Sequence, residues 1–247
     1  MTALAELLPI LGVFFLAGLV KGAVGFGLPV VAVALLPFFV PVETALAINA
    51  LVIVVTNLQQ IRQGGAYREG LSAAWALILG MALMVPVGAL FASDLEPDTL
   101  LLIVGAFILM FVVSNFIHPS LRTPEGWQNR TGFLTGLVSG VVGGLTSAPG
   151  PIFVAYVVSL HLPRPVFMTG LGFIMASFGT FAALSYAAVG VLRVEHLLPG
   201  AAAIPLAMLG MWAGDAWARR LAGDTFRKAI LILLGLLGLM LIRRSLF

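Results

Sequence analysis

The sequence contains no cysteine and very little charge, and both deficits restrict what the chain can be. Without cysteine it has no disulfide bonds, no thiolate ligands for a metal and no cysteine nucleophile. Charged residues make up only 9% of the 247 residues, whereas they make up about 25% of an ordinary soluble domain. Hydrophobic residues reach 61% and occur in several runs of about 20 residues. This composition predicts a polytopic α-helical membrane protein.

Features of an enzyme or of a nucleic-acid-binding protein are also missing. The three histidines, His118, His161 and His196, lie far apart in the sequence and lack metal-ligand spacing. The longest polar interruption, residues 118–130, is too short to form a catalytic domain. The net charge of +3 comes from basic residues in loops, which report membrane orientation rather than nucleic-acid binding. We therefore expect no enzymatic activity, no cofactor, no metal and no nucleic-acid partner.

A single charge, Lys21, interrupts the apolar stretch from Leu7 to Phe39. A straight helix of that length would be about 50 Å long, whereas the hydrocarbon core of a bilayer is about 30 Å thick. Residues that weaken or break helices cluster in the middle of the stretch: Gly22, Gly25, Gly27 and Pro29. The sequence therefore predicts a broken element over residues 7–40, with an irregular apex that carries Lys21.

The second half of the chain repeats this pattern. The segment 15–25 aligns with the segment 133–143, every glycine matches, and Lys21 falls opposite Ser139. Further along, Pro86 aligns with Pro205 at nearly the same offset. Chance similarity between apolar helices is the alternative interpretation. The shared order of glycines favours duplication.

We therefore predict an all-α polytopic membrane protein with two inverted repeats, each a broken-helix hairpin followed by three transmembrane helices. The first repeat covers residues 1–117, with its hairpin at 7–40 and its spans at 42–61, 71–92 and 98–117. A cytoplasmic connecting loop covers residues 118–130. The second repeat covers residues 131–247, with its hairpin at 131–160 and its spans at 165–190, 195–220 and 226–243.

The distribution of lysine and arginine supports hairpins over single kinked spans. With hairpins, one face collects nine basic residues: Arg62, Arg68, Arg122, Arg130, Arg164, Arg219, Arg220, Arg227 and Lys228. The opposite face keeps only Arg193, Arg243 and Arg244. The positive-inside rule then makes the first face cytoplasmic. Inverted repeats with interrupted helices are a frequent design of secondary transporters.

The two apices form the predicted binding site. The first apex contributes Lys21, Gly22, Gly25, Phe26, Gly27 and Pro29, and the second contributes Gly143, Gly144, Thr146, Ser147, Pro149 and Gly150. A helix break leaves N–H groups free at the start of the following half-helix, and such groups attract anions. We expect the apices to form a cage for a small anion. Asn49 and Thr169, which lie near the start of the helix after each hairpin, are expected to complete it.

Several of these residues also have a purely structural interpretation. Lys21 can extend to the membrane interface or pair with an acidic residue. Asn49, Asn57 and Thr169 can simply bond neighbouring helices, and Gln60 is expected at the interface. Glycines repeat at four-residue spacing, which is typical of close helix packing and leaves dimerisation open: Gly132, Gly136, Gly140 and Gly144.

The apices resemble those of the TauE/SafE family of membrane permeases, also called the sulfite exporter family. The resemblance rests on Gly18-x3-Gly22-x2-Gly25-x-Gly27-x-Pro29 and on Gly136-x3-Gly140-x2-Gly143-Gly144 leading to Pro149-Gly-Pro151. It implies transport of small sulfur-containing or carboxylate anions, such as sulfite, sulfoacetate or related organosulfonates, often as export. Only the second apex contains hydroxyl residues, so we expect the two halves to contribute unequally.

The predicted function is a secondary anion transporter of the plasma (inner) membrane that works by alternating access, with the anion and the lipid bilayer as partners. Coupling to a proton or a sodium ion and assembly as a homodimer stay open. One alternative is a passive anion channel that uses the same apices. The other is a membrane scaffold that transports nothing.

Overall fold

The computed structural model describes residues 2–116, 122–124, 126–218 and 223–246, which are mostly helical and include no strand. The α-helices are α1 (Thr2–Val24), α2 (Leu28–Leu35), α3 (Val42–Gly64), α4 (Tyr67–Asp94), α5 (Pro97–Phe116), α6 (Gln128–Thr146), α7 (Gly150–Ser159), α8 (Arg164–Ala188), α9 (Leu197–Ala218) and α10 (Gly223–Leu246). Two short 3-10 helices are η1 (Leu36–Phe38) and η2 (Val194–His196). Seven of the described helices are long and apolar enough to cross a membrane: α1, α3, α4, α5, α8, α9 and α10. The predicted all-α polytopic fold is confirmed.

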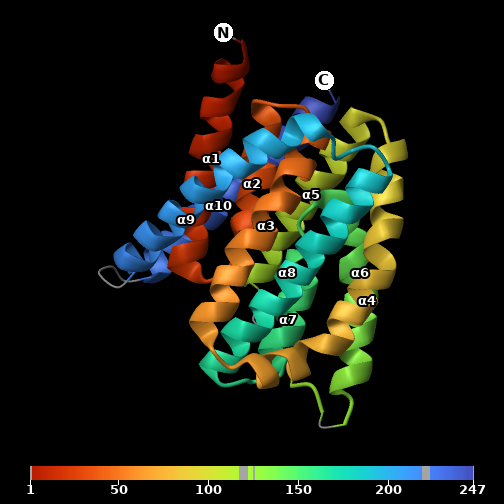
Figure 1. Cartoon of the computed structure of the whole chain (residues 1–247), viewed down its shortest axis with the longest axis vertical. Helices are drawn as coiled ribbons and strands as arrows, with labels where there is room; N and C mark the ends of the chain where they lie inside the picture. The colour runs from red at the N-terminus through yellow and green to blue at the C-terminus, as the bar shows by residue number, and fades with distance from the viewer. Residues whose placement is uncertain (1, 117–121, 125, 219–222, 247) are drawn as a thin grey trace.

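Both predicted helix breaks are present. Between α1 and α2 the chain passes through Gly25 and Gly27 at φ values of 89° and 105°, which glycine adopts readily because it has no Cβ. Figure 1 shows α1 descending from the N-terminus and α2 returning toward the same end. Between α6 and α7 the break falls at Ser147, whose φ of 54° is left-handed. α7 then returns toward the end of the molecule at which α6 begins (Figure 1).

Close helix pairs fix the relative directions of the helices. Gly136 and Gly144 on α6 meet the backbone of Leu77 and Val85 on α4, so α4 and α6 run parallel. Small residues are what allow two backbones to approach so closely. α1 and α9 form a second parallel pair of this kind (Figure 1). Each broken helix is therefore lined along its first part by a long helix from the other half of the chain.

The remaining long helices pair in the opposite sense. Gly172 on α8 packs against Ile61 on α3, and Gly179 packs against Ile53, so α3 and α8 are antiparallel. α5 and α10 are antiparallel as well, with Gly105 beside Ile242 near one end and Gly235 near Val112 at the other. These two pairs bring the two halves of the chain together around the breaks.

The predicted glycine stripe is a packing surface inside the chain. Gly136, Gly140 and Gly144 face α4, and Gly132 lies against the ring of Tyr156. The prediction of close helix packing is confirmed. Because α4 and Tyr156 cover the stripe, it is not free to pair with a second copy of the protein.

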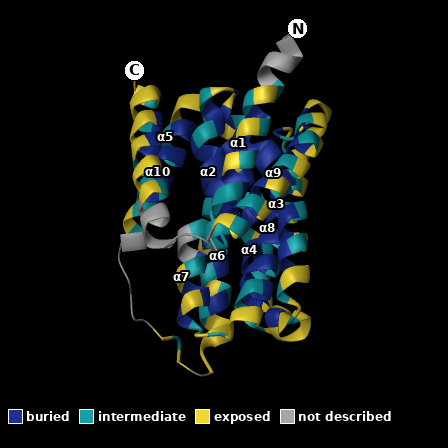
Figure 2. Cartoon of the chain, turned by 90° about the vertical axis from the view of Figure 1, so that its left-hand side faces the viewer, coloured by how far each residue is buried: buried dark blue, intermediate teal, exposed yellow. Residues whose placement is uncertain are grey.

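Apolar side chains cover the outside of the bundle as well as its core. Figure 2 shows buried residues along the inward sides of the helices and exposed residues on their outward sides. Exposed positions include Leu198 at 75% and Trp212 at 73% of their full accessible surface. Outward apolar side chains on long helices are suited to lipid tails. This arrangement agrees with an integral, multi-pass membrane protein.

Five residues of the predicted basic face occupy one end of the molecule. They lie in the last turn of α3, the first turns of α4, α6 and α8, and the segment before α6: Arg62, Arg68, Arg130, Arg164 and Arg122. Figure 1 places these segments at the end opposite both termini. The other four, Arg219, Arg220, Arg227 and Lys228, fall outside the described side chains.

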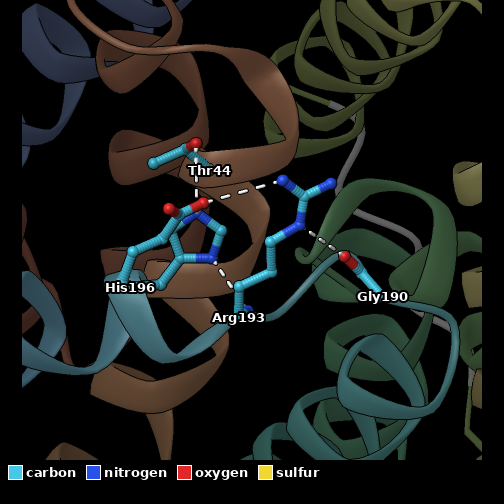
Figure 3. A network of polar contacts seen from close by, with 5 residues as sticks. Thr44, Gly190, Arg193 and His196 are labelled. Carbon is cyan, nitrogen blue, oxygen red and sulfur yellow. Dashed lines mark hydrogen bonds and ion pairs between the residues drawn. The ribbon is translucent and has the colours of Figure 1, made fainter.

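A polar network holds the connection between α8 and α9 against the start of α3 (Figure 3). The backbone N–H of Arg193 donates to Nδ1 of His196 at 3.1 Å. Nε2 of His196 lies 3.4 Å from Oγ1 of Thr44 and 3.7 Å from the Glu195 carboxylate. Nε of Arg193 donates to the carbonyl of Gly190 at 3.1 Å. These contacts fix where α9 begins.

Candidate functional site

A cavity lies between the two helix breaks. Residues from α1, α2, α3, α5, α7, α8 and both breaks line it: Lys21, Gly25, Phe26, Gly27, Pro29, Val30, Asn57, Gln60, Phe111, Pro149, Gly150, Phe153, Val154, Leu171 and Met175. Both half-helices, α2 and α7, begin at this cavity, and neither has a side-chain cap at its first turn. The positive ends of two helix dipoles therefore meet in one place.

Lys21 is the charged group of the cavity. Its side chain is only 4% exposed, and Nζ donates to Oδ1 of Asn57 at 2.6 Å. In the described part of the chain no ion pair joins Lys21 to a carboxylate. Burying an ammonium without a counter-ion costs several kcal/mol. The position is thus suited to an anion, and Lys21 does not extend to the interface in this structure.

Two amide side chains, those of Asn57 and Gln60, line the cavity together with Lys21. Nδ2 of Asn57 donates to the carbonyl of Ile53 at 2.7 Å, which leaves Oδ1 directed at the lysine. Nε2 of Gln60 lies 3.3 Å from the carbonyl of Met168. Gln60 is 3% exposed, so its side chain faces the interior of the bundle, and its predicted place at the membrane interface stays a prediction. The contact between Lys21 and Asn57 has a signal in the sequence. The two residues lie at similar distances along apolar segments that enter the membrane from the same side, so they are expected at similar depths.

The rest of the cavity wall is apolar and partly aromatic. The rings of Phe26 and Phe111 meet edge to face, with centroids 6.4 Å apart and an interplanar angle of 72°. Phe153 and Met175 add further apolar surface. Because the lining combines one ammonium and two amide side chains with aromatic rings, the cavity has an amphipathic character. It is suited to a ligand with a charged head and an apolar body.

Half of the predicted site residues line the cavity: Lys21, Gly25, Phe26, Gly27, Pro29, Pro149 and Gly150. The structure places three predicted glycines in helix packing instead. A Cβ on Gly22 would meet the carbonyl of Met211, one on Gly144 would meet that of Val85, and one on Gly143 would meet the ring of Phe178. These three positions need glycine because a neighbouring helix or ring leaves no room for a Cβ.

Asn49 and Ser147 lie next to the cavity and join the two breaks. Nδ2 of Asn49 donates to the carbonyl of Ser147 at 2.9 Å, and lies 3.3 Å from Oγ of Ser147 and 3.5 Å from the carbonyl of Pro29. Oγ of Ser147 donates to the carbonyl of Leu46 at 3.0 Å. We call this set of contacts the Asn49 tie. It connects the start of α2, the second break and α3.

The other two predicted hydroxyl residues bond within their own segments. Oγ1 of Thr146 donates to the carbonyl of Val142 at 2.8 Å. Oγ1 of Thr169 donates to the carbonyl of Pro165 at 2.9 Å, and its side chain packs against Gly64 and Gly70. Thr169 therefore lies outside the cavity, where α8 meets α3 and α4.

Comparison with known proteins gives one family match. The family model described as Sulfite exporter TauE/SafE matches residues 10–241. No curated protein and no solved structure matches the chain.

Proposed function

Because the chain belongs to the sulfite exporter TauE/SafE family, we propose that it is a secondary transporter that binds a small anion between its two helix breaks. Membership of this transporter family and the seven long apolar helices make it an integral, multi-pass membrane protein. The observation that carries the proposal is the buried Lys21, which faces a central cavity with an amide as its only described hydrogen-bond partner. The plasma (inner) membrane is the proposed location.

Organosulfonates suit the cavity better than sulfite does. An inorganic oxyanion needs hydrogen-bond donors on all sides to replace its hydration, whereas most of this wall is apolar. Lys21 and the starts of α2 and α7 supply positive charge on one side. Phe26, Phe111 and Phe153 provide apolar surface for an organic body. Sulfoacetate and related organosulfonates combine the two features.

Alternating access is the proposed mechanism, with the two halves as inverted repeats. The cavity is lined by the second half of α3 and the first half of α8, at Asn57, Gln60 and Leu171. The Asn49 tie lies in the first half of α3, closer to the end that carries the termini. Opening the cavity toward the end that carries the termini would then require the hydrogen bonds of the Asn49 tie to break. A homodimer stays a prediction, and it would have to use a surface other than the glycine stripe.

Anion flux into proteoliposomes that contain the purified protein tests the proposal. Sulfite, sulfoacetate, sulfate and acetate would be compared, and we expect saturable flux of sulfoacetate. Lys21→Met keeps the length of the side chain but removes its charge, so it should lower flux at subsaturating anion by about 100-fold. Lys21→Arg keeps the charge, and we expect it to retain flux within about tenfold of the native protein.

Counterflow exchange separates a transporter from the alternative of a passive channel. A transporter preloaded with unlabelled anion accumulates labelled anion transiently, whereas a channel does not. Unchanged flux in Lys21→Met would remove the assigned role of the lysine. Failure of the folded protein to move any of the four anions would leave the scaffold alternative.

A further inference from the structure

The side-chain amide of Asn49 is fully buried at the point where the two breaks meet. Three oxygen atoms surround its amino group: the carbonyl oxygens of Ser147 and Pro29 and the hydroxyl of Ser147. That hydroxyl donates its own hydrogen to Leu46, so all three oxygens present lone pairs to Asn49. Three lone pairs directed at one point attract positive charge, which the amino group of Asn49 supplies in part.

Oδ1 of the same amide has no hydrogen-bond partner among the described residues. A buried acceptor without a donor is destabilising. Ser147 also holds a left-handed φ of 54° without being glycine, which strains its backbone. Two unfavourable features therefore coincide in one fully buried place, and such local costs are frequent at ligand clamps.

The oxygens and the helix end at the second break favour a cation of low charge, whereas the positive ends of α2 and α7 face the neighbouring cavity. α6 ends at Thr146, so the negative end of its dipole lies at the second break. Carbonyls of unwound backbone and ends of half-helices bind sodium ions in broken-helix transporters. The three oxygens around the amino group of Asn49 are two backbone carbonyls and one hydroxyl, and none is a carboxylate. Neutral oxygens of this kind suit a monovalent ion rather than a divalent one.

We propose that Na⁺ binds between the Asn49 amide and the oxygens of Ser147 and Pro29 that now surround its amino group. The amide rotates by half a turn, so that Oδ1 joins the carbonyl of Ser147, its hydroxyl and the carbonyl of Pro29 around the ion. The unpartnered oxygen of the ion-free protein thereby becomes a ligand. The ion bridges the start of α2 and the second break, which makes it a cation counterpart to the neighbouring anion cavity.

The link to transport rests on the proposed function. Pro29 belongs both to the Asn49 tie and to the cavity wall, so a bound Na⁺ adds positive charge beside the anion. Each ion then raises the affinity of the other by the same factor, and we expect about tenfold. The direction of net transport follows the combined gradients of the two ions.

Thermal unfolding of the detergent-purified protein tests the site without any anion substrate. NaCl, KCl and choline chloride would be compared at one ionic strength. We expect Na⁺ at about 100 times its Kd to raise Tm by about 5 °C relative to choline. Equal Tm values in NaCl and choline chloride would overturn the proposal and leave the Asn49 tie as a structural contact only.

Variants of α3 locate the effect. Asn49→Leu removes all polar atoms and should abolish the response to Na⁺, whereas Asn49→Asp keeps two oxygens and should retain it. Thr56→Val is the matched control, because Thr56 is equally buried on α3 and its hydroxyl bonds only to carbonyls of its own helix, at Val52 and Ile53. A full Na⁺ response in a folded Asn49→Leu protein would overturn the assignment. If Asn49→Leu does not fold, the comparison of salts on the native protein decides.

Flux measurements keep this inference distinct from the proposed function. Sulfoacetate flux that is independent of Na⁺, together with a Tm that does not respond to Na⁺, would refute the cation site alone. A Na⁺-specific rise in Tm without any anion flux would uphold the site and refute the transporter proposal.

Discussion

The two helix breaks share a design but differ in how they are held. The first break, at Gly25 and Gly27, lines the cavity, and the side-chain hydrogen bond described beside it is the long 3.5 Å contact from Asn49 to the carbonyl of Pro29 at the start of α2. The second break is anchored from two helices, by Asn49 on α3 and by Tyr186 on α8, whose hydroxyl donates to the carbonyl of Gly144 at 2.7 Å. We infer that the first break presents backbone to the ligand and that the second fixes the frame against which it moves.

The largest expected effect comes from giving Lys21 an internal counter-ion. Asn57→Asp places a carboxylate where Oδ1 of Asn57 now lies, 2.6 Å from Nζ. The new ion pair competes with the bound anion, so we expect about a 100-fold loss of anion affinity. Binding calorimetry with sulfoacetate measures it, with Thr56→Val as the control. Unchanged affinity would mean that the anion does not bind at the first break.

A smaller effect is expected at the anchor of the second break. Tyr186→Phe removes the hydroxyl and leaves the carbonyl of Gly144 without this donor. The lost hydrogen bond should lower the free energy of unfolding by about 1 kcal/mol, visible as a drop in Tm. Anion affinity should change by less than about twofold, because Tyr186 does not line the cavity. A large loss of affinity with an unchanged Tm would reverse the roles assigned to the two breaks.

The smallest effect is expected at a residue that belongs to neither break. Thr169→Val preserves the shape of a side chain packed against Gly64 and Gly70 and removes one hydrogen bond within α8. We expect flux and anion affinity to stay within about twofold of the native values. A tenfold loss in the flux assay would restore Thr169 to the binding site, as its position in the sequence suggests.

The breaks themselves were predictable because their cause is local. Gly25, Gly27 and Pro29 interrupt an apolar run that is too long for one crossing, and the structure breaks there. Lys21 also made the location of the site predictable, because an isolated charge in a membrane segment needs a compensating environment.

The walls of the cavity were not predictable from the same evidence. Phe111, Phe153 and Met175 are apolar residues in apolar helices, and such residues look alike whether they face lipid, another helix or a cavity. Gly144 was predicted to contact the ligand, but it packs against α4 instead. The sequence does not separate these two roles for a glycine next to a break. Only the pairing of helices distinguishes these cases, and that pairing joins segments far apart in the sequence.

One such pairing has a consequence for synthesis of the chain. α1 packs along α9, and the guanidinium of Arg244 in α10 donates to the carbonyl of Pro37 at 2.6 Å, just after α2. The partners of the first hairpin thus leave the ribosome long after the hairpin itself. At about 5–20 residues per second, the hairpin with its buried lysine waits on the order of ten to forty seconds for them. Until then the insertion machinery has to hold the hairpin. A chain truncated before α9 should therefore become a substrate for quality-control proteolysis.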